Sequence, residues 1–134
     1  MTFKAKGRIL VVDDNEDVRL SMKLLLERAG YQVMVAPDGN RALELQRECP
    51  CQVLVTDIFM PEADGMETIE RFRREFRTVK IVAMSAGGRQ MGSRRYLATA
   101  GEVGADATLQ KPFEAATLLE TLRGLLSESG TMDT

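Results

Sequence analysis

The sequence predicts an α/β fold built on a five-stranded parallel sheet with helices on both faces. Short apolar segments, which are typical of strands buried on both faces, alternate along the chain with longer segments whose apolar residues recur at helical spacing. Five strands and five helices alternate in this way, which favours one doubly wound sheet because crossovers between parallel strands are right-handed. Polar residues at the ends of four of the strands, or shortly after them, indicate a site along one edge of the sheet.

The expected strands and helices follow one another without a repeat or a long linker. The strands are predicted at residues 9–12, 31–36, 53–57, 80–84 and 107–109. The helices are predicted at residues 16–29, 40–48, 66–76, 96–103 and 115–126. Asn15 can cap the first helix and Gly30 can end it, while Pro50 ends the second.

Length and charge fit one small domain. The chain has 134 residues, enough to bury a core, and its net charge of −2 does not favour nucleic acid or a membrane surface as a partner. The apolar segments are too short to span a bilayer, and no signal-peptide segment follows the basic N-terminus. We therefore expect a cytoplasmic domain over residues 8–127, with an N-terminal extension at 1–7 and a flexible tail at 128–134.

Cysteine and histidine usage excludes several kinds of site. The chain has no histidine, which removes catalytic triads and histidine bases, and it has two cysteines, Cys49 and Cys51, on either side of Pro50. Two thiols are too few for a metal site, and a disulfide between residues two apart would be strained. We interpret the pair as ordinary thiols, with a redox-sensing pair as the alternative.

Three carboxylates, one hydroxyl and one ammonium are expected to share the carboxyl edge of the sheet. Asp13 and Asp14 follow the first strand, Asp57 ends the third, Ser85 follows the fourth and Lys111 follows the fifth. Two carboxylates ~4 Å apart repel by about 4 kcal/mol at an effective dielectric of about 20, so three need a cation nearby or a raised pKa on one of them. Lys111 supplies one positive charge, and Mg²⁺ is the divalent ion that best fits ligands made only of oxygen. Carboxylates that hold Mg²⁺ beside a phosphate indicate phosphoryl transfer.

With their neighbours, these residues resemble the receiver domain of a two-component response regulator. The resemblance extends over residues 8–127, and its motifs occur in order with the expected strands and helices between them. The motifs are Asp13-Asp14, Asp57 with Met60-Pro61 and Gly65, Ser85-Ala86, Gly104-Ala105 and Lys111-Pro112-Phe113. The glycine-rich stretch after Ser85 is similar to that of some stand-alone receivers of the CheY-like type. The resemblance implies a flavodoxin-like (βα)5 fold.

The resemblance also implies a role for each carboxylate. Asp57 is the implied phospho-acceptor, which takes a phosphoryl group from a phosphohistidine on a sensor histidine kinase or a histidine phosphotransfer protein. Asp14, Asp57 and the backbone carbonyl of Phe59 are implied to hold Mg²⁺, with Asp13 acting through water. Lys111 and the ion would neutralise charge on the phosphoryl oxygens.

Further positions are implied to contact the phosphoryl group or to transmit its presence. Ser85 would hydrogen-bond a phosphoryl oxygen. The Lys111–Pro112 peptide bond is expected to be cis, which would direct the lysine toward the acids. Thr108 stands where the family often has a switch aromatic that moves between exposed and buried positions, so the switch of this chain departs from that pattern.

The implied function is a phosphorylation-controlled switch or a relay, and not an enzyme. Nothing after residue 127 resembles a DNA-binding or catalytic domain, so the target is expected to be another protein, and receivers often form homodimers through the last two helices and the strand between them. A degenerate receiver that binds partners without phosphate is the alternative. A phosphatase is disfavoured because Phe59 stands where such enzymes commonly carry a second acid. A flavodoxin-like cofactor binder is disfavoured because Asp13-Asp14 stands where a hydroxyl-rich phosphate loop is needed.

Overall fold

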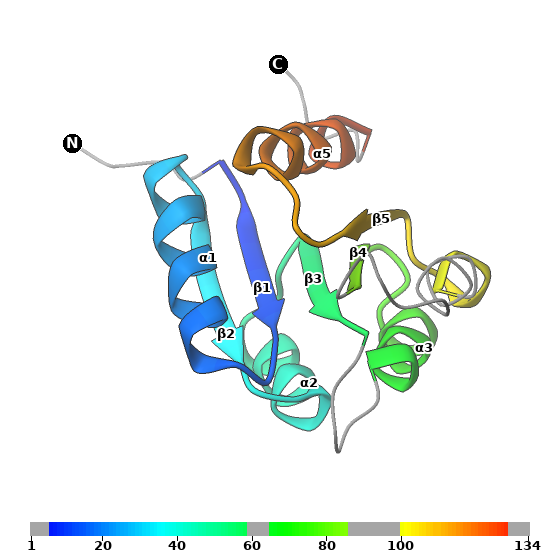
Figure 1. Cartoon of the computed structure of the whole chain (residues 1–134). Helices are drawn as coiled ribbons and strands as arrows, with labels where there is room; N and C mark the ends of the chain where they lie inside the picture. Colours follow the sequence, from blue (N-terminus) through cyan, green and yellow to red (C-terminus); the bar gives the residue numbers. More distant parts are fainter. Residues whose placement is uncertain (1–5, 59–64, 86–99, 129–134) are drawn as a thin grey trace.

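The computed structural model describes residues 6–58, 65–85 and 100–128, which form a five-stranded parallel sheet flanked by helices (Figure 1). The strands are β1 (Arg8–Val12), β2 (Gln32–Ala36), β3 (Val53–Asp57), β4 (Lys80–Ser85) and β5 (Ala107–Gln110). They lie in the order β2-β1-β3-β4-β5, and every neighbouring pair is parallel. The predicted doubly wound α/β fold is therefore confirmed.

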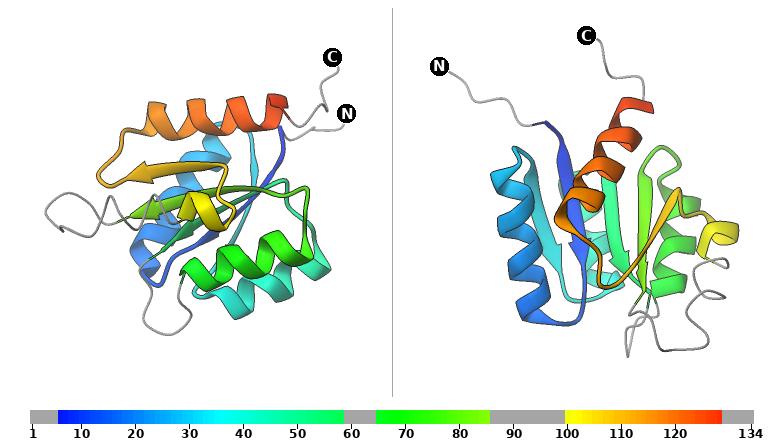
Figure 2. Two further views of the ribbon diagram at one scale, coloured as in Figure 1. Left: turned by 90° about the vertical axis from the view of Figure 1, so that its right-hand side faces the viewer. Right: turned by 45° about the horizontal axis from the view of Figure 1, so that its top comes forward.

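Helices cover both faces of the sheet (Figure 2). They are α1 (Glu16–Arg28), α2 (Gly39–Glu48), α3 (Gly65–Glu75) and α5 (Ala115–Glu128). Successive side chains of β1 point to opposite faces, so Ile9 and Val11 pack in the core under α1 and α5, whereas Leu10 and Val12 pack in the core under α2 and α3. This two-sided burial explains why the inner strands are apolar throughout.

The helix ends follow the residues that the sequence places there. The side chain of Asn15 accepts a hydrogen bond from the backbone N–H of Val18 at 3.1 Å and caps α1, and Asp38 caps α2 by accepting from Arg41 at 2.9 Å. Gly30 follows α1 with a φ of 106°, in the left-handed region that glycine adopts without strain. The predicted cap and stop of the first helix are confirmed.

The described residues include Lys6 and Gly7, before the predicted domain, and Glu128, after it. The backbone N–H of Lys6 donates to the carbonyl of Gly30, and the carbonyl of Gly7 accepts from Gln32, each at 2.9 Å, so part of the predicted extension is bound to the sheet. Helix α5 continues to Glu128, two residues past the predicted helix end at residue 126. Of the predicted helix at 96–103, residues 100–103 are described and helical. Residues 1–5 and 129–134, in the predicted extension and tail, lie outside the described ranges.

Replacing Gly124 with alanine is expected to stabilise the protein by about 0.5–1 kcal/mol. Gly124 lies in the exposed interior of α5, where an added methyl group meets nothing within 4 Å. Alanine favours the helix and restricts the unfolded chain. Urea unfolding measures the change. Gly104→Ala is the contrasting control and is expected to destabilise, because Gly104 has a φ of 135° and the methyl would lie 3.0 Å from Cγ of Arg73. An unchanged or lower stability of Gly124→Ala would contradict the prediction.

Both cysteines are free thiols. Cys49 follows α2 and is half-buried, whereas Cys51 is buried and its backbone N–H donates to Oε1 of Gln46 at 2.9 Å. Burial raises the pKa of the Cys51 thiol to about 12, which keeps it protonated at neutral pH. A protonated buried thiol is a poor nucleophile, so the environment of Cys51 favours the interpretation as ordinary thiols.

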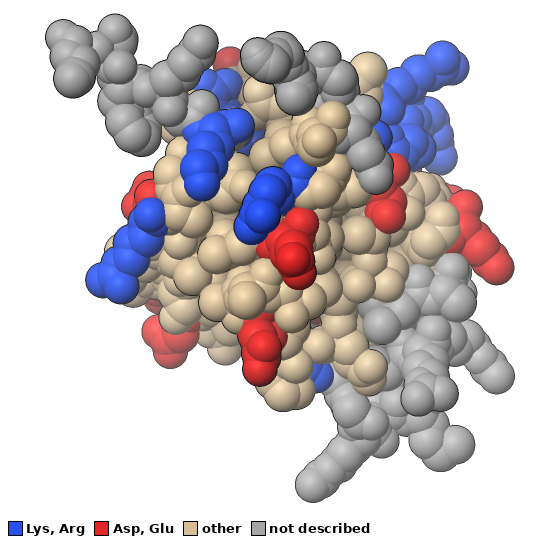
Figure 3. Space-filling view, turned by 90° about the horizontal axis from the view of Figure 1, so that it is seen from above, with Lys and Arg blue, Asp and Glu red and all other residues tan. Residues whose placement is uncertain are grey.

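Charges of both signs are mixed on the molecular surface. Figure 3 shows lysine and arginine side chains interspersed with aspartate and glutamate on the face seen from above. This mixture agrees with the net charge of −2. Among the described helices, none combines the length and the apolar composition that crossing a membrane requires.

Candidate functional site

The register of the parallel strands brings the predicted polar residues to one edge of the sheet. Val12 of β1 pairs with Thr56 of β3, so Asp13 and Asp57 come next on neighbouring strands. Asp57 in turn pairs with Met84 of β4, and the following residue, Ser85, pairs with Gln110 of β5 directly before Lys111. The site therefore follows from strand pairing, because residues far apart in the sequence reach the same edge.

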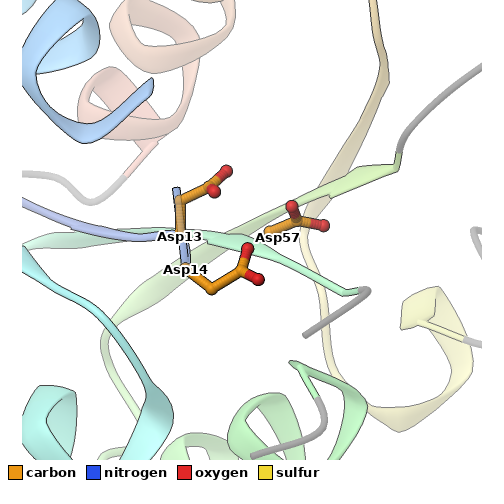
Figure 4. A group of neighbouring side chains, drawn as sticks. All are labelled: Asp13, Asp14 and Asp57. Atoms are coloured by element: carbon orange, nitrogen blue, oxygen red, sulfur yellow. The ribbon is translucent and has the colours of Figure 1, made fainter. Parts of the chain in front are cut away.

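Asp13, Asp14 and Asp57 form a compact cluster of carboxylates (Figure 4). Each side chain offers an oxygen that lies within 4.8 Å of an oxygen of the other two. Asp13 and Asp57 are only 1% and 6% exposed, whereas Asp14 is exposed. Two negative charges at about 4 Å repel by about 4 kcal/mol in a partly solvated site, so the cluster stores electrostatic repulsion that a cation relieves.

Lys111 relieves part of this repulsion. Its Nζ lies 3.1 Å from Oδ2 of Asp13 and 3.4 Å from Oδ2 of Asp57. Burial favours the neutral amine, but the charges of Asp57 and Asp13 outweigh it and hold the pKa of Lys111 above its ordinary value. The Lys111–Pro112 peptide bond is cis, and the backbone N–H of Lys111 donates to the carbonyl of Ser85 at 2.8 Å. The site therefore contains a fixed ammonium group.

Asp13 is anchored by four hydrogen bonds from four parts of the chain. Its backbone N–H donates to the carbonyl of Ala36 at 3.2 Å, and its backbone carbonyl accepts from Nη1 of Arg19 at 2.7 Å. Its carboxylate accepts from the backbone N–H of Asn15 at 2.9 Å through Oδ1 and from Lys111 at 3.1 Å through Oδ2. Both carboxylate oxygens of Asp13 are therefore already bonded to protein donors.

Asp14 has a different environment from that of Asp13. Its side chain is exposed, and within residues 6–58, 65–85 and 100–128 no protein group donates a hydrogen bond to it. Asp14 can therefore give its oxygens to a bound ion, together with Asp57. A divalent ion of hard character that prefers oxygen and retains several waters fits this donor set, so the residues present suit Mg²⁺.

The other predicted site residues are Ser85, Thr108 and Phe59. Ser85 is completely buried at the end of β4, one residue after the partner of Asp57. Thr108 lies in β5 opposite Ala83 with an exposed side chain, three residues before Lys111. Phe59, whose carbonyl is an implied ion ligand, lies outside the described residues, so that expectation stays a prediction.

Arg19 contacts the site and is absent from the sequence-based predictions. It lies in α1, and its half-buried side chain reaches back to the carbonyl of Asp13. The helical periodicity of α1 predicts which of its residues face the core, but it does not predict the direction of a long cationic side chain such as that of Arg19. One feature of the sequence could have indicated the contact: Arg19 is a cationic residue that follows soon after Asp13 and the helix cap at Asn15.

Comparisons with known proteins agree with the site. A profile of the response regulator receiver domain matches residues 9–123. The transcriptional regulatory protein CpxR of Escherichia coli is 34% identical over 123 residues, which cover 92% of this chain and 50% of CpxR. The response regulator MprA of Mycolicibacterium vanbaalenii is 38% identical over 119 residues, which cover 89% of this chain and 50% of MprA. The chain thus spans about half the length of these curated relatives.

Two solved structures of similar proteins share the fold along almost their whole length. A CheY-like receiver domain protein of Methanospirillum hungatei superposes with a TM-score of 0.85 at 28% identity and covers 94% of this chain and 97% of its own. The chemotaxis protein CheY4 of Vibrio cholerae gives a TM-score of 0.81 at 30% identity, and the superposition covers 90% of this chain and 99% of CheY4. Receiver domains are phosphorylated by histidine kinases and generally bind Mg²⁺ at an acidic pocket such as this one. The chain belongs to the response regulator receiver domain family.

Proposed function

We propose that Asp57 is the phospho-acceptor of this receiver domain and that its phosphorylation requires Mg²⁺. The observation that carries the proposal is the position of its buried carboxylate, 3.4 Å from the ammonium of Lys111 and within 4.8 Å of oxygens of Asp13 and Asp14. Asp13 is less accessible to an incoming phosphoryl group, because it is 1% exposed and Asp57 is 6% exposed. Asp14 is exposed and has no cationic partner among the described residues.

The proposed reaction transfers a phosphoryl group from a phosphohistidine of a partner protein. A carboxylate oxygen of Asp57 attacks phosphorus, a P–O bond forms, the P–N bond breaks, and the leaving imidazole takes a proton from solvent. Lys111 stays protonated and offsets negative charge on the phosphoryl oxygens, which is the role its raised pKa supports. Asp14, Asp57 and the carbonyl of Phe59 would hold Mg²⁺, with Asp13 acting through water, and the ion would supply further positive charge for those oxygens.

We further propose that the protein is a stoichiometric acceptor and not a phosphatase that turns over external substrates. Phe59 stands two residues after Asp57, where enzymes of that kind commonly carry a second acid that protonates the leaving group. The phosphorylated domain would then change its binding to another protein or pass its phosphoryl group to a histidine phosphotransfer protein. Loss of labelled phosphate to such a protein supports the relay, and phosphorylation-dependent capture of a target supports the switch.

Incubation with acetyl phosphate and Mg²⁺ tests the acceptor assignment. Wild type is expected to gain the mass of one phosphoryl group, and Asp57→Asn is expected to gain none, because the amide cannot attack phosphorus. Asp38→Asn is the matched control: it makes the same change at the cap of α2, where asparagine also caps well, and it should react like wild type. If wild type gains no mass, the alternative of a receiver that binds partners without phosphate is favoured. If Asp57→Asn gains as much mass as wild type, the acceptor is a residue other than Asp57.

A further inference from the structure

We propose that Arg19 is a positioning residue of the acid cluster, which sets the direction of Asp14 and thereby the affinity of the site for Mg²⁺. This inference rests on the proposed function of the site. It is carried by one contact outside the carboxylates themselves, the 2.7 Å hydrogen bond from Nη1 of Arg19 to the carbonyl of Asp13. A guanidinium is permanently charged and presents its donors in a planar fork, so it can hold a carbonyl in a fixed direction.

Arg19 is itself held in a well-defined place. Its backbone N–H donates to the carbonyl of Asn15 at 3.1 Å in the first turn of α1. The side chain of Asn15 caps the same turn through the N–H of Val18. The guanidinium therefore extends from a fixed helical turn back to the end of β1, and the loop between strand and helix is closed by a side chain from inside the helix.

The carbonyl that Arg19 holds belongs to the peptide unit between the two acids. A peptide unit is planar, so fixing the direction of the Asp13 carbonyl also fixes the direction in which the chain enters Asp14. Asp13 does not depend on this bond alone, because its N–H is bonded to Ala36 and its carboxylate to Asn15 and Lys111. The bond to Arg19 therefore acts mainly on the next residue, Asp14.

Asp14 is the residue that most needs such backbone control. Its carboxylate is exposed, and it has no protein donor among the described residues, so its backbone alone directs it toward Asp57. Without Arg19, the peptide between Asp13 and Asp14 gains freedom while Asp13 stays anchored. Asp14 then points at the ion site for a smaller fraction of the time, and Mg²⁺ binds less tightly. Groups behind metal ligands commonly change metal affinity tenfold or more when they are lost.

Losing the positive charge of Arg19 and losing its hydrogen bond to Asp13 should change the Mg²⁺ affinity in opposite directions. The titration can therefore separate the two effects. Removing the positive charge of Arg19 beside an acidic cluster should by itself favour a divalent cation. Weaker Mg²⁺ binding in a neutral variant can therefore be explained only by lost positioning. A purely structural hydrogen bond, in contrast, would lower the free energy of unfolding without a selective change in Mg²⁺ affinity.

The experiment is a calorimetric titration with Mg²⁺ alone of wild type, Arg19→Gln and Arg19→Lys. Glutamine is too short to reach the Asp13 carbonyl, so Arg19→Gln is expected to raise the Kd for Mg²⁺ about tenfold. Lysine keeps a donor at nearly the same reach, so Arg19→Lys should restore most of the affinity. Arg28→Gln is the matched control, since Arg28 is exposed in the last turn of α1, and it should bind like wild type.

Phosphorylation by acetyl phosphate provides the second measurement. The rate of Arg19→Gln should fall at low Mg²⁺ and return to the wild-type rate at saturating Mg²⁺, because Asp57 and Lys111 are unchanged. Circular dichroism checks that each variant is folded, and Arg19→Met, which keeps the apolar stem of the side chain, replaces Arg19→Gln where the latter does not fold.

An unchanged or lower Kd in Arg19→Gln would overturn the positioning role, and so would an Arg19→Lys variant as weak as Arg19→Gln. Both results leave the proposed function intact as long as wild type binds Mg²⁺ and accepts a phosphoryl group. Failure of wild type itself to do so contradicts the proposed function instead, so the two failures are distinguishable.

Discussion

Lys111→Met is expected to slow phosphoryl incorporation from acetyl phosphate by about a hundredfold or more, the usual effect of removing one preorganised donor from a developing anion. Its ammonium lies 3.1 Å from Asp13 and 3.4 Å from Asp57, where an incoming phosphoryl group adds negative charge. Intact-mass kinetics at saturating Mg²⁺ measure the rate. Lys80→Met is the control and should retain the wild-type rate, because Lys80 lies at the start of β4 and the site lies at the other end of the strands.

The same substitution is expected to lower stability by about 3 kcal/mol in Mg²⁺-free buffer at neutral pH, because it leaves two buried carboxylates without their cation. The pKa of Lys111 is raised by folding, so its contribution is fully present below its ordinary pKa of 10.5 and is lost as pH rises through the higher folded value. Urea unfolding of wild type and Lys111→Met should therefore differ at neutral pH and converge at strongly alkaline pH. A variant that is as fast and as stable as wild type would show that the ammonium has no role in the site.

Gly65→Ala is expected to destabilise the protein by about 3 kcal/mol, at the upper end of the cost of overpacking. Gly65 begins α3, and an added methyl would collide with the carbonyl oxygen of Asp57 and with Cα of Ile58, and lie 2.9 Å from the carbonyl carbon of Asp57. These are backbone atoms at the end of β3, where the N–H of Ile58 is bonded to the carbonyl of Met84 at 3.0 Å. They cannot retreat without disturbing the sheet and the acceptor.

Urea unfolding and the phosphorylation rate measure the effect of Gly65→Ala. Gly101→Ala serves as its control, because Gly101 is exposed and helical and an added methyl there meets nothing within 4 Å. We expect the control to be at least as stable as wild type. If both variants unfold at the same urea concentration, the backbone at the end of β3 does not exclude a side chain at position 65, which would contradict the prediction.

The arrangement of the sheet and the cluster was predictable for a simple physical reason. Apolar segments such as 53–57 indicate buried parallel strands, and parallel strands bring their carboxyl ends together whatever their distance in sequence. The sequence alone therefore predicts that Asp13, Asp57 and Lys111 lie at one edge of the sheet. The cap at Asn15 was predictable because a short polar side chain before a helical pattern has few other uses.

The parts that were not predicted depend on single long side chains. Arg73 is an example: its guanidinium donates to the carbonyls of Val79 and Gly104 at 2.7–2.8 Å and to the carboxylate of Asp106 at 2.7 Å, which joins α3 to the start of β4 and the turn before β5. In the sequence it reads as one more charge on an exposed helical face. Arg19 was missed for the same reason, since periodicity identifies which face of a helix is apolar and does not identify which backbone carbonyl an arginine reaches.

The central claim is that the side chain of Asp57, and no other carboxylate of the cluster, carries the phosphoryl group. Borohydride reduces an acyl phosphate to an alcohol and leaves free carboxylates intact, so it converts a phosphorylated aspartate into homoserine. After treatment with acetyl phosphate and Mg²⁺, reduction and peptide sequencing by mass spectrometry should find homoserine at position 57 in wild type. Homoserine at position 13 or 14, or at none of the three, would contradict the account.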